Sequence, residues 1–393
     1  MTKHAILSAS GSARWLACPP SARLEQEFES TTSQYAEEGR FAHQLAELHL
    51  QHFLGIVTKR QLDARVNKEL KKSDFYSQEM EDYVQVYVDI AIEKINAARA
   101  KSDDAIIFLE QLLDFSAWVP DGFGTGDLVL VADGVVEVVD LKYGKGVPVS
   151  AEGNTQMRLY GLGAFWNYDM LYDIQAVRMT IVQPRLDSIS TEEIPASELI
   201  AWGNDVVKPI AQLAFEGKGE FTAGDHCQFC RAKHTCHARA EANLELAKYE
   251  FREPPLLTDG EIADVLGRAA ELTSWASDIQ EYALIQARDH GKKWPGWKLV
   301  EGRSNRKYAD EDAVADTLKA AGYKENDIYE QILKGITKME KILDKKKFAE
   351  LLTEAELVVK PPGKPTLVPE SDKRPEIDPI ASAKQDFKDK GED

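Results

Sequence analysis

Apolar residues in the first hundred positions recur with the period of amphipathic helices. A helix is predicted over 33–54, where apolar side chains keep helical spacing until Gly55 provides a stop. A second helix is predicted over 76–100, on apolar residues at helical spacing: Val84, Tyr87, Val88, Ala91 and Ile95.

The period changes to that of β-strands after residue 105. Short runs rich in β-branched residues predict strands, and Asp133-Gly134 is typical of a two-residue hairpin turn. The order of elements predicts an α/β fold with a mixed central sheet flanked by helices. The predicted strands are 106–115, 125–133, 135–143 and 174–184, and helices are predicted over 152–168 and 195–216.

The last third of the chain has a different character. Thr258 and Glu261 form a capping-box pattern that begins a long amphipathic helix ending near His290. Shorter helices are expected over 310–352. The sequence therefore predicts three parts, listed here by residue range: a first domain over 1–250, a mostly helical region over 251–360, and a proline-rich, charged tail over 361–393 that is extended or disordered.

Composition restricts the function only in part. The net charge of −18 argues against a protein that coats nucleic acid through bulk electrostatics, although a local basic groove remains compatible with it. No window reaches the apolar length of a membrane span, and the N-terminus lacks the apolar core of a signal peptide. We therefore expect a cytoplasmic protein without a membrane partner.

Acidic residues and a lysine are predicted to converge at the open end of the hairpin. Asp140 and Lys142 are two positions apart on a strand and so project to the same face. Pairing about the Asp133-Gly134 turn places Asp127 opposite Asp140, and Glu110 on the preceding strand could support the site. Neighbouring carboxylates repel unless a cation lies between them, which favours Mg²⁺ or Mn²⁺.

A cation at this position suits phosphodiester chemistry. It could polarise a phosphate and lower the pKa of a water, while Lys142 orients that water or neutralises growing charge. A D-x-K motif alone is more often an ordinary hairpin end. Two further motifs favour the catalytic interpretation: Gly39-x-x-x-His43 on the first helix and Gln156-x-x-x-Tyr160 on the helix after the hairpin.

The order G-x-x-x-H, G-x-x-D, D-x-K, Q-x-x-x-Y resembles the RecB-like branch of the PD-(D/E)XK nucleases, over about residues 10–240. Gly126 stands where that pattern has proline. The resemblance implies a restriction-endonuclease-like core with a C-terminal helical region. It implies metal ligation by His43, Asp127, Asp140 and the backbone carbonyl of Leu141, catalysis by Asp127, Asp140 and Lys142, and positioning of the site and DNA by Gln156 and Tyr160.

Four cysteines form a second constellation. Cys227, Cys230 and Cys236 lie within ten residues, and Cys18 lies far upstream. Four thiolates suit zinc or a [4Fe–4S] cluster, nearby histidines permit a mixed zinc site, and four unrelated buried cysteines are the remaining alternative. One cysteine before the nuclease core and three after it resembles the iron–sulfur nucleases, including AddB-type domains and CRISPR-associated exonucleases. That resemblance implies a [4Fe–4S] cluster joining the two ends of the domain.

A basic, aromatic segment covers residues 291–308. Basic side chains could follow a phosphate backbone while aromatic rings stack on bases. The alternative is a connector whose tryptophans are core and whose lysines are solvated. The candidate DNA-binding residues are Lys292, Lys293, Trp297, Arg303 and Arg306.

These observations predict a metal-dependent DNA exonuclease that acts on single-stranded DNA or DNA with free ends. A flap or junction endonuclease using the same site is an alternative. A non-catalytic iron–sulfur DNA-binding subunit is another, although the intact set of site residues argues against it. The chain is also similar to a phage-encoded family whose genes lie near replication genes, which makes phage replication and recombination proteins candidate partners.

Overall fold

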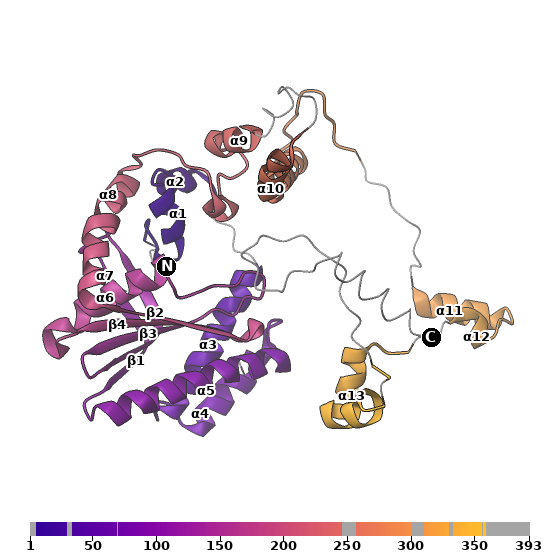
Figure 1. The fold of residues 1–393 in the computed structure, drawn as a ribbon. Coiled ribbons are helices and arrows are strands. Elements are labelled where there is room, and N and C mark those ends of the chain that lie inside the picture. The colour runs from indigo at the N-terminus through magenta and orange to yellow at the C-terminus, as the bar shows by residue number, and fades with distance from the viewer. Residues whose placement is uncertain are drawn as a thin grey trace, which may run out of the picture. The chain divides into compact units, whose positions relative to one another are not determined.

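Five strands, in the order of the sequence, form one mixed sheet in the computed structural model (Figure 1). The strands β1, β2 and β3 form an antiparallel meander, β3 and β4 are parallel, and β5 is antiparallel to β4. The parallel step requires a crossover, which α6 provides. The strand bounds are β1 Ile106–Asp114, β2 Phe123–Ala132, β3 Val135–Leu141, β4 Ala176–Gln183 and β5 Ser188–Pro195.

Helices cover both faces of the sheet. Three of them, α3, α4 and α5, enclose one apolar core, and α6, α7 and α8 enclose the other together with the N-terminal α1 and α2 (Figure 1). The bounds are α1 Ser12–Ala17, α2 Ser21–Leu24, α3 Gln34–Phe53, α4 Lys59–Lys68, α5 Gln78–Lys101, α6 Thr155–Tyr172, α7 Ala196–Trp202 and α8 Lys208–Glu216.

Glycine allows α6 to lie close against the sheet. The Asn154 side chain caps its first turn by accepting from the backbone N–H of Met157. A Cβ atom at Gly163 would lie 3.1 Å from the backbone carbonyl carbon of Leu113, so a larger residue would push the helix away from β1. Gly163 therefore allows close packing between α6 and β1.

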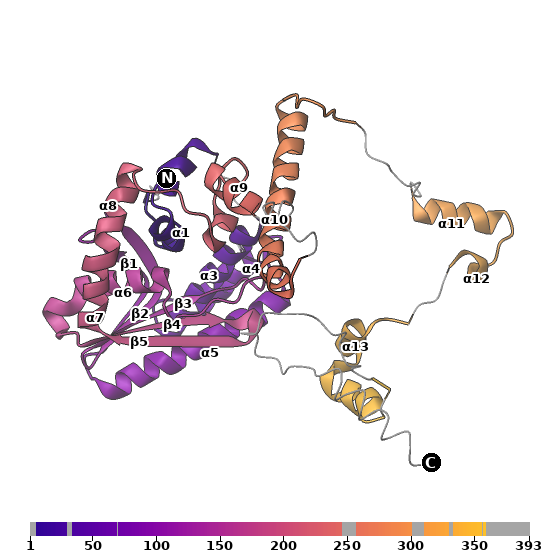
Figure 2. The same ribbon diagram turned by 45° about the horizontal axis from the view of Figure 1, so that its top comes forward.

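The structure describes residues 5–29, 34–68, 70–245, 257–300, 310–329, 333–355 and 357–358. Two units are distinguished, 1–290 and 291–393. The first ends with α9 His237–Leu244 and the long α10 Asp259–Asp289, which lie side by side (Figure 2). The second contains α11 Glu311–Ala320, α12 Glu325–Ile328 and α13 Ile336–Phe348. The predicted tail over 361–393 lies outside the described residues.

The predicted α/β fold with a mixed sheet and flanking helices is confirmed. The elements that were not predicted include the short helices α1, α2 and α9, the helix α4 and the edge strand β5. In β5, exposed and half-buried residues alternate, and only Ile194 is buried, so its hydrophobic pattern is weak. Among the described residues, no helix combines the length and apolar character needed to cross a membrane.

Candidate metal centre

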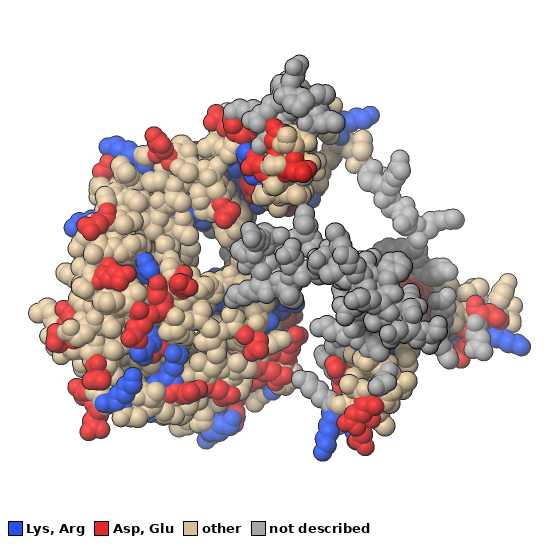
Figure 3. Space-filling view, viewed as in Figure 1, with Lys and Arg blue, Asp and Glu red and all other residues tan. Residues whose placement is uncertain are grey.

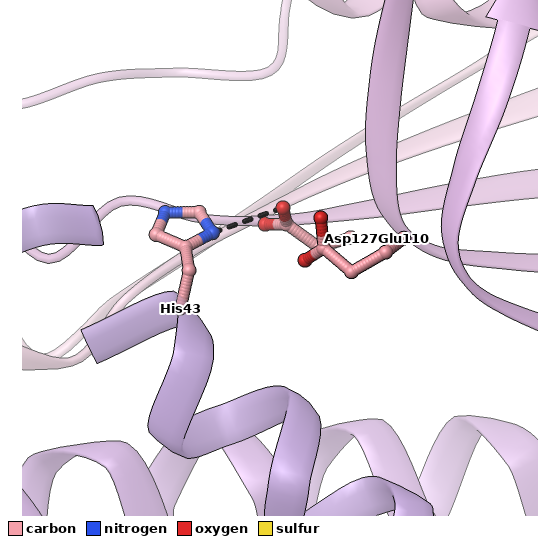
Figure 4. A group of neighbouring side chains, drawn as sticks. All are labelled: His43, Glu110 and Asp127. Atoms are coloured by element: carbon pink, nitrogen blue, oxygen red, sulfur yellow. Dashed lines mark hydrogen bonds and ion pairs between the residues drawn. The ribbon is translucent and has the colours of Figure 1, made fainter. Parts of the chain in front are cut away.

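Three side chains from separate elements converge beside the sheet. His43 comes from α3, Glu110 from β1 and Asp127 from β2, and Figure 4 shows them pointing toward one another. One potential ligand atom of each lies within 4.8 Å of the others. His43 Nδ1 is 2.9 Å from Asp127 Oδ1. An imidazole and two carboxylates form a donor set that suits Mn²⁺ or Mg²⁺.

The convergence depends on an irregularity in the strands. Glu110 lies opposite Asp127 in the register of β1 and β2, and its φ of 49° is in the left-handed region. Before it, Leu109 packs on the α3 and α5 side, whereas Leu113, also an odd position, packs on the α6 side. The alternation of β1 therefore reverses at Glu110, which turns its carboxylate toward α3.

A second group lies at the end of β3. Lys142 Nζ is 2.8 Å from Asp140 Oδ2 and donates a 3.1 Å hydrogen bond to Gln156 Oε1. Gln156 Nε2 in turn donates to the Tyr160 hydroxyl at 3.1 Å. The structure thus brings together the D-x-K motif and the Q-x-x-x-Y motif, with the lysine held between a carboxylate and an amide.

Asp127 links the two groups. Its Oδ2 accepts a 2.7 Å hydrogen bond from the backbone N–H of Leu141, while its Oδ1 faces His43. The register of β2 and β3, continued by one pair, sets Asp127 opposite Asp140 as the hairpin predicted. Asp140 lies outside the three-residue ligand group and pairs with Lys142 instead. Ligation by Asp140 and by the Leu141 carbonyl stays a prediction.

Gly124, which begins the G-x-x-D motif, makes room for Tyr160. A Cβ atom at Gly124 would lie 2.4 Å from Cε1 of the tyrosine ring, a distance at which the ring would have to move. Glycine is therefore needed at this position of the motif for a steric reason, which the sequence alone does not show. It lets the Tyr160 ring pack against β2 beside the Lys142 and Gln156 pair.

The pKa values show an excess of negative charge. Burial, then the Asp127 charge, raises the pKa of Glu110 to about 7. Burial alone would lower the pKa of His43, but the charge and hydrogen bond of Asp127 raise it to about 9. Burial also raises the pKa of Asp140, against the opposing effect of Lys142. Without a cation, protons on His43 and Glu110 compensate this charge, and a divalent cation could replace them.

Glu110 is the residue of the candidate centre for which the sequence predicted only a supporting part. It lies in a strand whose pattern gives no sign of a positive φ, and it matches none of the four motifs. The sequence separation between Glu110 and Asp127 shows that the two residues are neighbours only when the register of β1 and β2 is known. A carboxylate on the strand next to the hairpin was the one available signal.

The cysteine segment, residues 227–236, contacts the N-terminal segment, residues 14–25, which lies more than 200 positions earlier in the sequence. Arg14 donates to the Phe229 carbonyl at 3.2 Å, and Glu25 accepts from the Arg231 backbone N–H at 2.8 Å. A hydrogen bond with Cys18 raises the pKa of His226, so Cys18 lies beside this segment. Cys18 and Cys227 are buried, and Cys230 and Cys236 are partly exposed.

The cysteines are not arranged as a closed zinc site. A tetrahedral zinc with Zn–S bonds of about 2.3 Å holds its sulfurs roughly 3.8 Å apart. In the part of the chain that the structure describes, no three cysteine sulfurs lie within 4.8 Å of one another. The described residues therefore show no cysteine cluster, and a [4Fe–4S] cluster stays a prediction.

The described part of the basic segment forms an exposed turn. Trp297 donates its backbone N–H to the Trp294 carbonyl across Pro295 and Gly296, whose φ is 80°. The Trp297 side chain is 83% exposed, so it is not a core residue within the described structure. Lys292 lies over the Trp294 ring at 4.1 Å. Arg303 and Arg306 lie outside the described residues.

Charges of both signs are interspersed on the face of the first unit shown in Figure 3. The net charge of the whole chain is −18.

Comparison with known proteins gives a family and a distant structural match. The match is to a structure titled "Crystal structure of SSO0001", at 15% identity, covering 49% of this chain and 94% of that chain. Its TM-score of 0.23 is too low to support an inference about the present chain. The family model described as "Protein of unknown function (DUF2800)" matches residues 4–375. Because this match spans almost the whole sequence, the chain belongs to the DUF2800 family.

Proposed function

We propose that this protein is a DNA nuclease that depends on a divalent metal and belongs to the RecB-like PD-(D/E)XK type. The observation that carries the proposal is the convergence of His43, Glu110 and Asp127 beside the Asp140 and Lys142 pair. Hard oxygen donors, one imidazole and a partly buried lysine in one place suit phosphodiester hydrolysis better than they suit a structural role. The four-motif resemblance adds to this argument.

The residues have distinct parts in the proposed reaction. His43, Glu110 and Asp127 would hold the cation, which supplies polarisation of the phosphate and a lowered water pKa. Lys142 would orient the attacking water or neutralise charge on the phosphate, because its ammonium is fixed by Asp140 and Gln156. Tyr160 would keep Gln156 in place through their hydrogen bond.

DNA contacts outside this centre are proposed for Lys292, Lys293 and Trp297. Both lysines and the Trp297 ring are exposed, so phosphate contact and base stacking are sterically open to them. Arg303 and Arg306 are proposed on sequence grounds alone. A [4Fe–4S] cluster on Cys18, Cys227, Cys230 and Cys236 completes the proposal, as a structural element rather than a catalytic one.

The experiment compares cleavage of linear and closed circular DNA, single- and double-stranded, with Mg²⁺ or Mn²⁺. Asp140→Asn and Lys142→Ala should each lower the rate by about 100-fold or more, because both remove transition-state electrostatics. Asp133→Asn is the matched control, since it changes an aspartate of the same hairpin in a turn that tolerates asparagine.

The form of the substrate then decides the subclass. Cleavage of linear DNA alone supports an exonuclease, whereas cleavage of flaps or circles supports an endonuclease. If folded Asp140→Asn and Lys142→Ala cut DNA at the rate of the control, the nuclease proposal is wrong. Melting temperature and circular dichroism establish that the variants are folded.

A further inference from the structure

Tyr87 places a hydroxyl group inside the protein where no described residue forms a hydrogen bond with it. The residue lies on α5, its side chain is 1% exposed, and its Oη atom is buried. Its ring packs in the core between α3, α5 and the sheet. An unpaired buried hydroxyl is destabilising, and phenylalanine at this position would avoid that cost. The hydroxyl therefore suggests a ligand.

The Tyr87 hydroxyl borders the metal centre. A cavity of about 10 Å³ separates the tyrosine from the ligand group, and this is roughly the space of one water. Four of the eight lining residues carry a carboxylate or an imidazole, Tyr87 carries a hydroxyl, and the other three are apolar. The lining residues are His43, Ala46, Glu47, Leu50, Tyr87, Glu110, Asp127 and Leu141.

The hydroxyl stays protonated in this setting. Burial, followed by the charges of Asp127, Asp140 and Glu110, raises the pKa of Tyr87 well above its ordinary value. A neutral hydroxyl can both accept and donate a hydrogen bond. It can therefore accept from a water on the cation and still remain neutral beside three carboxylates.

We propose that Tyr87 is a positioning residue of the metal centre, whose hydroxyl holds one water of the cation's coordination shell in this cavity. His43, Glu110 and Asp127 supply three ligands. With the predicted Asp140 carboxylate and Leu141 carbonyl the protein supplies five at most, so at least one position of the octahedral shell of Mg²⁺ or Mn²⁺ is left for water. The lining residues Ala46 and Leu50 are buried and offer no polar partner, and the Glu47 carboxylate already accepts a hydrogen bond from Gln51. This role rests on the proposed metal centre and does not require that the protein cuts DNA.

The test measures Mn²⁺ affinity of the full-length protein by calorimetry, independently of any activity. Tyr87→Phe should weaken Mn²⁺ binding by about 10–100-fold, the usual effect of losing a partner that orients a metal's ligands. The metal-free variant should melt at the same temperature as the wild type or higher, because an unpaired hydroxyl is removed.

Tyr168→Phe is the matched control. Tyr168 is a buried tyrosine of α6 whose ring stacks on Phe108, in the other core of the sheet. Its replacement removes the same atom away from the centre, so Mn²⁺ affinity should not change. A loss seen in both variants would mean that general repacking, and not the Tyr87 hydroxyl, alters the affinity.

His43→Ala separates failure of the inference from failure of its premise. Loss of binding in His43→Ala with unchanged affinity in Tyr87→Phe overturns the role of Tyr87 and leaves the metal centre standing. Binding that His43→Ala does not affect overturns both. The expected Mn²⁺ results combined with no DNA cleavage would refute the nuclease proposal and support the role of Tyr87.

Discussion

The left-handed backbone of Glu110 links strand geometry to the chemistry of the candidate centre. A non-glycine residue at φ 49° costs about 1–3 kcal/mol and persists only where its surroundings enforce this conformation. Here the conformation turns a carboxylate toward His43 and Asp127. The strain is therefore retained at the position where it brings a third ligand into reach.

Glu110→Gly and Glu110→Ala together measure this strain. Both remove the carboxylate, so both should weaken Mn²⁺ binding. Only glycine relieves the backbone, so in metal-free urea unfolding it should be more stable than alanine by about 1 kcal/mol. Equal stability of the two variants, or greater stability of alanine, would show that position 110 is not strained.

The raised pKa values predict that metal binding releases protons. His43, with a pKa of about 9, is almost fully protonated at pH 7, and Glu110, with a pKa of about 7, is half protonated. A cation must displace these protons, so Mn²⁺ binding at pH 7 should release about one proton or more. Calorimetry in two buffers of different ionisation enthalpy measures this number. Release of no protons would contradict the assignment of these ligands.

The same shifts determine how the stability of the metal-free protein depends on pH. Both groups have higher pKa values when folded, so the folded state binds more protons than the unfolded state. Their contribution to the free energy of unfolding is complete at pH values below the pKa values of the unfolded state. It is lost as pH rises through about 7 for Glu110 and through about 9 for His43. The stabilisation by Mn²⁺ should accordingly be larger at pH 8.5 than at pH 6, as melting temperatures can show.

At the scale of elements, ion pairs are prominent among the contacts of α10, which lies beside α9 (Figure 2). The helix has no buried residue among those described, yet Arg239 of α9 is 1% exposed and pairs with Glu271 and Asp278 at 2.6 Å each. Lys233 adds a 2.5 Å contact to Asp278, and the His234 ring stacks on Tyr282 of α10 at 4.1 Å. The buried guanidinium is therefore a main contact between the two helices.

Arg239→Met should release α10 from α9. The loss should cost less than the removal of one partner from a fully buried ion pair, because Lys233 still pairs with Asp278 and Glu271 is 42% exposed. Hydrogen exchange should then rise along α10 while the sheet keeps its protection. Arg288→Met is the control, since the Arg288 pair with Asp289 is exposed and should contribute little. Unchanged exchange in α10 after Arg239→Met would mean that other contacts hold the helix.

The sequence predicted elements with strong periodicity and missed those shaped by tertiary contacts. Strands β1 to β4 and helices α3, α5 and α6 were predicted within a few residues, because their apolar patterns match one period throughout. The shared face of Asp140 and Lys142 followed from strand geometry. Glu110 was predicted only as a possible supporting residue and not as a metal ligand. The reversal of alternation in β1 depends on the backbone angle of Glu110, which the residue type does not reveal.

At the scale of the whole molecule, the N-terminal segment and the cysteine segment close the first unit. Their contacts join residues about 200 positions apart, through Arg14 to Phe229 and Glu25 to Arg231. Cys18 and Cys227 lie in these two segments and are buried. A cluster bound across them would constrain a very long loop, so its loss should affect the stability of the entire unit.

Cys18→Ser and removal of iron should therefore have the same effect. Protein purified without oxygen should be brown and contain about four irons per chain. Relative to this protein, both the variant and the chelator-stripped wild type should melt lower by about 5 °C or more, corresponding to a few kcal/mol. Treatment of the Cys18→Ser variant with the chelator should change its melting temperature little, because the link between the N-terminal segment and the cysteine segment is already lost. Colourless protein with one zinc per chain would instead support a zinc site, and a metal-free wild type that melts like the loaded one would leave the four cysteines as ordinary packed residues.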